Sequence, residues 1–149
     1  MIKKLSNTNY NQNSLANYLH DVDNDFEIPL SKKTDIDAYS IKILGNGVVF
    51  VSMENDNING LLAGYCNDIE NGNAIISILS VKKSFRGRGI SRLLVNSMIE
   101  ICQQTKMKKI YVDSVNPIAV AIYKSCNFII DRVEAHNEIS KTYLVYNLI

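Results

Sequence analysis

The order of apolar and polar positions along the chain predicts a mixture of helices and strands. Apolar residues recur with helical spacing in four segments, which predicts helices over 14–22, 31–44, 90–104 and 117–126. Short apolar runs bounded by Asn- and Gly-containing turns predict strands over 2–5, 48–53, 60–66, 74–79, 108–115, 128–133 and 142–148. This order predicts a single mixed α/β (α+β) domain over residues 1–149, with a partly antiparallel sheet.

Two of these segments carry further expectations about packing. The run Ala74–Leu79 shows little alternation, so we expect a strand that is covered on both faces. In the helix over 90–104, one polar stripe contains Arg92, Asn96, Glu100 and Gln103, whereas the remaining positions are mostly apolar and include Leu93. We therefore expect this helix to pack broadly on the sheet.

Charge and cysteine content exclude several classes of function. Sixteen basic residues nearly balance fifteen acidic ones, so the net charge of +1 argues against a general nucleic-acid-binding protein. No apolar run approaches the roughly 20 residues that span a bilayer, and the start Met1-Ile2-Lys3-Lys4-Leu5 lacks the apolar stretch of a signal peptide. Cys66, Cys102 and Cys126 have no metal-ligand or disulfide spacing, so we expect reduced thiols in a cytoplasmic protein and no metal.

The segment between the strand over 74–79 and the helix over 90–104 has the chemistry of an anion site. The first amides of a helix lack internal partners, and the helix dipole adds partial positive charge at the same end. Gly87 and Gly89 let the backbone approach a bulky anion, and Arg86 and Arg88 supply full charges. The sequence therefore predicts a phosphate site here, with a basic loop that binds no ligand as the alternative.

Two nucleotide-binding motifs do not fit this loop. A Walker loop requires Gly-Lys followed by Ser or Thr, and the dinucleotide fingerprint requires a third glycine that Gly87-x-Gly89 lacks.

Arg86-Gly87-Arg88-Gly89-Ile90-Ser91 instead resembles the Arg/Gln-x-x-Gly-x-Gly/Ala signature of the GNAT acetyltransferases, with Ser91 in place of Gly or Ala. A second segment resembles the same family downstream. Asn116, Ala119, Tyr123 and Phe128 match its Asn-x-x-Ala-x-x-x-Tyr-x-x-x-Gly-Phe pattern, and Asn127 replaces Gly at a helix end that needs a positive φ.

The resemblance implies a GNAT fold, acetyl-CoA as cosubstrate, and direct transfer of the acetyl group to an amine. The fold has about four helices around a mostly antiparallel sheet of about seven strands, splayed at the acetyl-CoA site. Nine residues are implied to bind the cosubstrate: Leu79, Val81, Arg86, Gly87, Arg88, Gly89, Ile90, Ser91 and Asn116. Tyr123 is implied as the acid that protonates the leaving thiolate, since its phenol is protonated at neutral pH. Packing of Tyr123 and helix capping by Asn116 are the alternatives from the residues alone.

The general base and the acceptor stay open. The strand over 74–79 offers Ser77 as its polar residue, so the candidate bases are Asp68, Glu70, Asp113, Glu134 and His136, or a water chain. The acceptor is expected to be a small primary amine, with an amino-sugar nucleotide as one option; the alternatives are a protein amine, or a module that binds acyl-CoA as a sensor or scaffold without catalysis. A homodimer through the strand over 142–148 is a further option, with internal pairing of that strand as the alternative.

Overall fold

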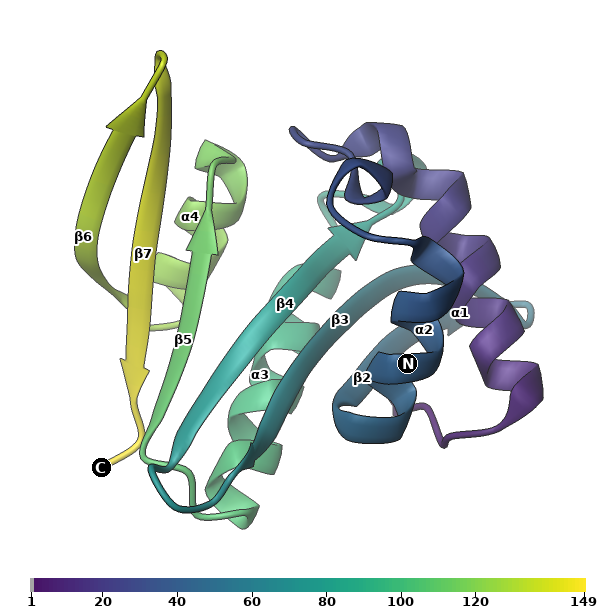
Figure 1. Cartoon of the computed structure of the whole chain (residues 1–149), viewed down its shortest axis with the longest axis horizontal. Helices are drawn as coiled ribbons and strands as arrows, with labels where there is room; N and C mark the ends of the chain where they lie inside the picture. The colour runs from purple at the N-terminus through teal and green to yellow at the C-terminus, as the bar shows by residue number, and fades with distance from the viewer. Residues whose placement is uncertain (1) are drawn as a thin grey trace.

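A seven-stranded sheet forms the centre of the protein in the computed structural model, which describes residues 2–149 (Figure 1). Its strands follow the order β1-β2-β3-β4-β5-β7-β6. They are β1 (Ile2–Lys4), β2 (Val48–Glu54), β3 (Asn57–Asp68), β4 (Asn73–Val81), β5 (Lys109–Ser114), β6 (Ile129–His136) and β7 (Ile139–Asn147). All neighbours pair antiparallel except β4 and β5, which are parallel. The expected fold class is confirmed.

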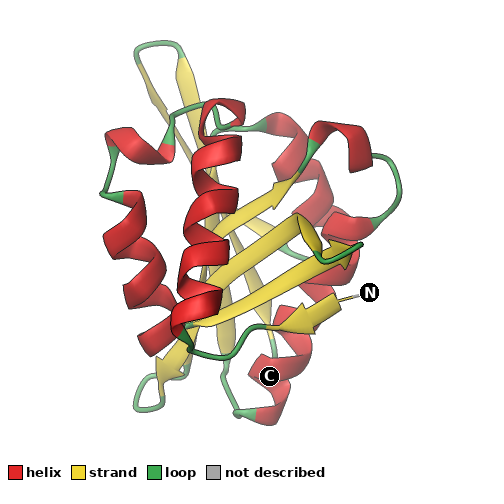
Figure 2. Ribbon diagram, turned by 90° about the vertical axis from the view of Figure 1, so that its right-hand side faces the viewer, coloured by secondary structure: helices red, strands yellow, loops and turns green. Residues whose placement is uncertain are grey.

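Four helices cover the two faces of the sheet (Figure 2). They are α1 (Asn9–Val22), α2 (Ile36–Asn46), α3 (Ile90–Gln104) and α4 (Pro117–Ser125). One core joins α3 and α4 to the sheet and contains Leu94, Met98 and Tyr123. A second core joins α1 and α2 to the other face and contains Leu15 and Ile43. The sheet is therefore the middle of three layers on the β2–β4 side.

The sheet splits open between its two parallel strands. Only Asn73–Ile75 of β4 pair with Lys109–Tyr111 of β5, and beyond these residues the two strands diverge (Figure 1). A bulge interrupts the β3–β4 ladder at the same point, because Ala63 pairs with Ile78 and Gly64 with Ile76. The residue left between them is Ser77, which faces the opening. The expected splay of the sheet is thus confirmed.

Local chemistry explains where the chain turns. Asn55 and Asp56 both have positive φ, 52° and 63°, as a two-residue type I′ turn between β2 and β3 requires. Asn127 follows α4 with a φ of 73°, which confirms the expectation that Asn replaces Gly at a left-handed position there. Asn116 caps α4 by accepting a hydrogen bond from the Ile118 amide at 2.9 Å.

Several boundaries differ from the predictions. Helix α1 begins at Asn9 rather than residue 14, since Thr8 caps it by accepting from the Asn11 amide. Helix α2 begins at Ile36 rather than residue 31, because Asp35 is the capping residue and residues 30–32 form a 3₁₀ turn.

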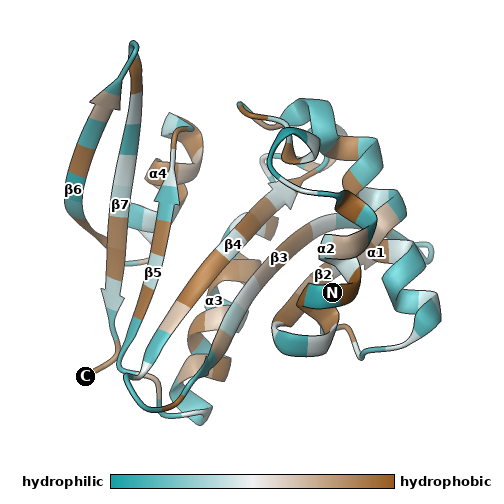
Figure 3. Cartoon of the chain, viewed as in Figure 1, coloured by the Kyte–Doolittle hydropathy of each residue, from teal (hydrophilic) through white to brown (hydrophobic). Residues whose placement is uncertain are grey.

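Two packing expectations hold only in part. Helix α3 packs broadly on the sheet as expected, but Leu93 is 53% exposed, because it shares the outer side of α3 with Arg92 and Asn96. Strand β4 is covered on both faces only over part of its length, since Ile75 is 49% exposed. Its apolar run has another cause: the bulge directs Ile76 into the α3 core and Ile78 into the α1–α2 core, so hydropathy does not alternate along the strand (Figure 3).

The apolar segment near the C-terminus lies inside the sheet and is not an edge. Strand β7 pairs with β5 on one side and with β6 on the other. Internal pairing, the alternative to a dimer edge, is therefore what the sequence over 142–148 encodes. The edge on this side is β6, all eight of whose residues are exposed.

Candidate active site

A cavity of about 890 Å³ occupies the opening between β4 and β5. Its walls come from Ser77–Val81 of β4, the segment from Phe85 to Arg92 apart from Arg88, the end of β5 and helix α4. Two further segments complete it: the connection between α1 and α2, with Phe26 and Lys33, and the β6–β7 hairpin, with Glu134 and Tyr143. Segments far apart in the sequence thus meet around one cavity. It is lined by Tyr123 and by every residue predicted to bind the cosubstrate except Arg88.

The loop between β4 and α3 opens into this cavity. Gly87 and Gly89 have φ values of 80° and 78°, and a Cβ atom on either would meet no atom within 4 Å. The left-handed backbone alone thus favours glycine at both positions. Gly89 is the N-cap of α3 and provides no side-chain cap, so no protein side chain satisfies the first amides of the helix from that position. An uncapped helix start and an open, glycine-lined approach fit a diphosphate.

The cations near the loop are not equivalent. The Arg86 Nε atom donates a hydrogen bond to the Val81 carbonyl at 3.0 Å, which fixes the base of this side chain at the cavity wall. Arg88, in contrast, stacks over the Phe85 ring at 4.9 Å and lies 3.9 Å from Glu54, and it is not among the lining residues of the described chain. Lys82 and Lys83 pair with Asp21 and Asp25 of the α1 end. Arg86 is therefore the better placed of the two arginines predicted to bind the cosubstrate.

The other predicted binding residues lie along the same cavity. Leu79 and Val81 are on the β4 wall, Ile90 and Ser91 begin α3, and Asn116 begins α4. Backbone groups of β4 that point toward β5 have no ladder partner beyond Ile75, so they are available to an extended ligand.

Tyr123 lies on the opposite wall from β4 and is only 3% exposed. Its ring packs against Phe128, with 5.5 Å between the ring centroids, which holds the side chain in place. Burial, and to a smaller extent the nearby negative charge of Asp113, raise the pKa of Tyr123 above that of a free phenol. The group is thus a proton donor at neutral pH.

The candidate bases separate into two groups. Asp68 and Glu70 lie at the β3–β4 turn and outside the cavity lining of the described residues, and Asp68 accepts a hydrogen bond from the Asn71 amide. Asp113, Glu134 and His136 line the cavity. The structure therefore brings only these three candidate bases to the proposed reaction site.

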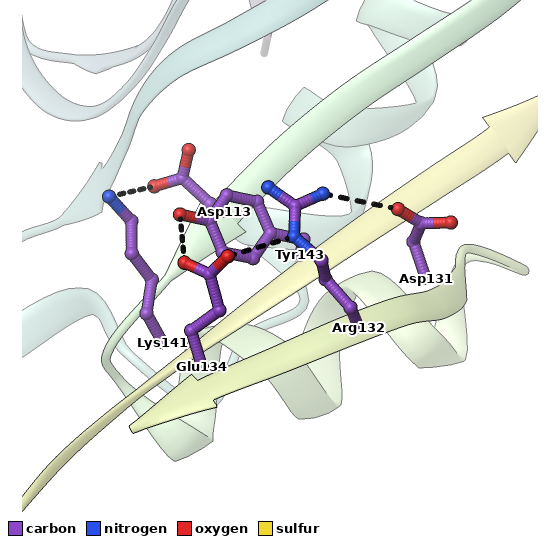
Figure 4. A network of polar contacts seen from close by, with 6 residues as sticks. All are labelled: Asp113, Asp131, Arg132, Glu134, Lys141 and Tyr143. Carbon is purple, nitrogen blue, oxygen red and sulfur yellow. Dashed lines mark hydrogen bonds and ion pairs between the residues drawn. The ribbon is translucent and has the colours of Figure 1, made fainter. Parts of the chain in front are cut away.

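A polar network ties two of these carboxylates to neighbouring side chains (Figure 4). Lys141 Nζ lies 3.4 Å from Asp113, and the Tyr143 hydroxyl donates to Glu134 at 3.1 Å. Arg132 donates to Glu134 at 3.1 Å, and its guanidinium lies 3.8 Å from the Tyr143 ring centroid. The hydrogen bonds from Arg132 and then Tyr143 lower the pKa of Glu134. Glu134 is thus ionised and weakly basic.

Sequence reasoning missed two contacts on the β4 wall. The Tyr39 hydroxyl of α2 donates a hydrogen bond to Ser77 at 2.9 Å. The Tyr18 hydroxyl of α1 and the Ser80 hydroxyl lie 3.0 Å apart. Tyr18 and Tyr39 are distant from β4 in the sequence and carry no motif, so only the placement of α1 and α2 on the sheet reveals them.

Two other features, a metal site and a membrane-spanning helix, are not found in the part of the chain that the structure describes. Within residues 2–149, no group of three or more His, Cys, Asp or Glu side chains is arranged to hold a metal ion. No helix in that range combines the length and apolar character needed to cross a bilayer.

Comparison with known proteins identifies the family and the fold. The profile of the acetyltransferase (GNAT) family matches residues 15–128, whereas no curated protein matches the sequence. Among solved structures, aminoglycoside 6′-acetyltransferase type Ii superposes with a TM-score of 0.81 at 14% identity, over 100% of this chain and 97% of that chain. Ribosomal-protein-alanine N-acetyltransferase from Brucella melitensis superposes with a TM-score of 0.77 at 15% identity, over 99% of each chain.

A third structure, from Bacillus anthracis, was solved in complex with acetyl coenzyme A. It superposes with a TM-score of 0.62 at 19% identity, over 70% of this chain and 64% of that chain. At these identities the three structures share the fold with this chain.

Proposed function

The chain belongs to the acetyltransferase (GNAT) family, whose members use acetyl-CoA, and we propose that it transfers the acetyl group directly to a primary amine of a small molecule. The observation that carries the proposal is that a single cavity contains the glycine-rich loop, the unpaired side of β4 and Tyr123. These are the three parts needed to hold a diphosphate, an extended thioester arm and a leaving thiolate.

The cosubstrate is proposed to lie along β4 from the loop toward the bulge. Arg86, Gly87, Gly89, Ile90 and Ser91 would hold the diphosphate through backbone amides and one guanidinium. The backbone groups at Leu79 and Val81 would pair with the arm, as a neighbouring strand does elsewhere in the sheet. Asn116 would add a hydrogen bond beside its capping role, and Arg88 would act from a distance through its charge.

Tyr123 is proposed as the general acid. The amine nitrogen forms a bond to the thioester carbon, the carbon–sulfur bond breaks, and the sulfur takes the phenol proton of Tyr123. The phenol of Tyr123 is protonated at neutral pH, so a proton is available when the sulfur takes up negative charge. The proton lost by the amine would leave through water in the cavity or through one of the three candidate bases that line it, and water would return a proton to Tyr123.

The acceptor is proposed to enter between the α1–α2 connection and the β6–β7 hairpin, which form the remaining walls of the cavity. Amino sugars are one acceptor class for a test, including the amino-sugar nucleotides and the aminoglycosides named for one similar structure. A peptide with an N-terminal alanine represents protein amines, following the name of another. The free state of Cys66, Cys102 and Cys126 supports a cytoplasmic location.

A thiol-release assay with acetyl-CoA tests the transferase activity. The panel contains an aminoglycoside, an amino-sugar nucleotide, a polyamine and the alanine peptide, and the expected result is amine-dependent release with at least one of them. The variant Tyr123→Phe is expected to lose about 10²- to 10⁴-fold in turnover, the range for a general acid, while it binds acetyl-CoA as before. Unchanged turnover would remove Tyr123 from the mechanism. Tight acetyl-CoA binding without release to any amine would favour a non-catalytic sensor or scaffold.

A further inference from the structure

Ser77 occupies an unusual place on the β4 wall of the cavity. It is the bulged residue between the pairs Ala63–Ile78 and Gly64–Ile76, so it lies outside the regular β3–β4 ladder. It also follows Ile75, the last β4 residue that pairs with β5, and therefore lies where the two parallel strands separate. Its side chain is exposed and lines the cavity. A hydroxyl at this position faces the ligand from the strand itself.

The hydrogen bond from Tyr39 determines what this hydroxyl can do. Tyr39 is the donor and the Ser77 Oγ atom the acceptor, at 2.9 Å. A serine hydroxyl has one hydrogen and two lone pairs, so this contact uses a lone pair and leaves the hydrogen free. Accepting a hydrogen bond also polarises the O–H group and makes it a stronger donor to the next partner. The Tyr39–Ser77 pair is thus a donor directed at the cavity.

The position along the strand indicates which part of the cosubstrate this donor meets. The diphosphate loop directly follows β4, so a bound arm runs back along the strand past Val81 and Leu79 toward Ser77. Four residues of extended strand correspond to about 13 Å. The thioester is at the end of the arm remote from the diphosphate, and Tyr123 lies on the opposite wall.

We propose that the Ser77 hydroxyl, oriented by Tyr39, donates a hydrogen bond to the thioester carbonyl oxygen of bound acetyl-CoA. This inference rests on the proposed function and deepens it, because it assigns a side-chain donor to the oxygen on which negative charge develops. When the amine attacks, the carbonyl π electrons move to that oxygen, and the charge returns to sulfur when the carbon–sulfur bond breaks. A fixed donor stabilises the charged stage more than the neutral carbonyl, so it accelerates the reaction.

The direct test is the carbonyl stretching frequency of acetyl-CoA labelled with ¹³C at the carbonyl carbon, measured by infrared difference spectroscopy on the protein of residues 1–149. A hydrogen bond to the oxygen lowers this frequency relative to the free cosubstrate. The expected lowering is present in the native protein and in Ser77→Thr, which keeps the hydroxyl, and is lost in Ser77→Ala. Tyr39→Phe is expected to give a smaller lowering, and the double variant Ser77→Ala/Tyr39→Phe should match Ser77→Ala.

Tyr18→Phe is the matched control, because it removes the other phenol that reaches a β4 serine without altering the Tyr39–Ser77 pair. It should leave the frequency at the native value. With an amine that supports turnover, Ser77→Ala should also lower kcat by about 100-fold, as loss of one oxyanion donor does, with unchanged affinity for acetyl-CoA.

A native frequency in Ser77→Ala, confirmed as folded by its circular dichroism, overturns the role of Ser77. Equal effects of Tyr18→Phe and Tyr39→Phe would also overturn it, since the shift would then reflect general packing of α1 and α2. Failure of the native protein to bind acetyl-CoA in a titration is a separate result that refutes the proposed function itself. The spectroscopic measurement needs no acceptor, so it also decides the role of Ser77 if no amine in the panel is a substrate.

Discussion

Replacement of Gly89 by alanine tests the interpretation of the loop most directly. Gly89 has a φ of 78°, and an added Cβ atom would meet nothing within 4 Å. The variant Gly89→Ala therefore suffers no steric clash with its surroundings, and its cost is that of placing alanine in a left-handed conformation. This cost is about 1–2 kcal/mol. The free energy of unfolding should fall by that amount, which for a chain of this size lowers the melting temperature by about 2–8 °C.

Gly45→Ala is the matched control for this substitution. Gly45 lies inside α2, its φ is not positive, and an added Cβ would lie at an ordinary contact distance of 3.7 Å from the Asn7 Nδ2 atom. The same chemical change should therefore raise the free energy of unfolding by about 0.5–1 kcal/mol, because alanine loses less conformational freedom on folding.

Urea denaturation of both variants and calorimetric titration with acetyl-CoA are the measurements. Gly89→Ala should also bind acetyl-CoA about tenfold more weakly, which corresponds to about 1.4 kcal/mol, since the new methyl group projects into the open space before the helix. Gly45→Ala should bind as the native protein does. If Gly89→Ala is as stable as Gly45→Ala and binds acetyl-CoA with native affinity, the reasoning about this loop is refuted.

Three further predictions concern the fold. Burial raises the pKa of Tyr18 to about 12, whereas the unfolded phenol ionises near 10. The free energy of unfolding should therefore be intact below about pH 10 and fall by about 3 kcal/mol as the pH rises toward 12. Urea midpoints between pH 9 and 11.5 should fall in the native protein and fall less in Tyr18→Phe. Leu94 is fully buried on the side of α3 that faces the sheet, so Leu94→Ala should lower the free energy of unfolding by about 2–5 kcal/mol in urea denaturation. A smaller loss would show that neighbouring side chains fill the space that the substitution leaves. Asn127→Gly should raise the melting temperature and Asn127→Ala should lower it, because φ is 73°; equal effects would contradict the assigned conformation.

Local signals in the sequence were sufficient to predict the loop between β4 and α3 and the start and end of α4. The order of strand, Gly87, Gly89 and helix is contained in one continuous segment, and the left-handed conformations at both glycines and at Asn127 agree with it. Asn116 likewise precedes the proline of α4 and caps the helix as expected. These features depend on neighbours in the chain, so a single sequence is enough to predict them.

The remaining walls of the cavity could not be predicted in the same way. The apolar run of β4 did not reveal that Ile75 is exposed, because the bulge that directs Ile76 and Ile78 into different cores leaves no mark in the hydropathy pattern. The pairing of Tyr39 with Ser77 joins α2 to β4 across 38 positions, and Lys141, the partner of Asp113, comes from the β6–β7 hairpin. Such contacts depend on how α1, α2 and the β6–β7 hairpin are placed on the sheet, which no short segment specifies.

The short β4–β5 ladder also has a mechanical consequence. Three residue pairs connect the four strands β1–β4 to the three strands β5–β7 within the sheet, so the two parts are linked by a narrow hinge supplemented by helix packing. We expect amide protons on the two sides of this hinge to exchange with solvent as two groups, because they belong to separate sets of hydrogen bonds. A molecule that spans the opening would contact both parts at once, so acetyl-CoA is expected to make them exchange as one and to act as a structural connection as well as a reactant.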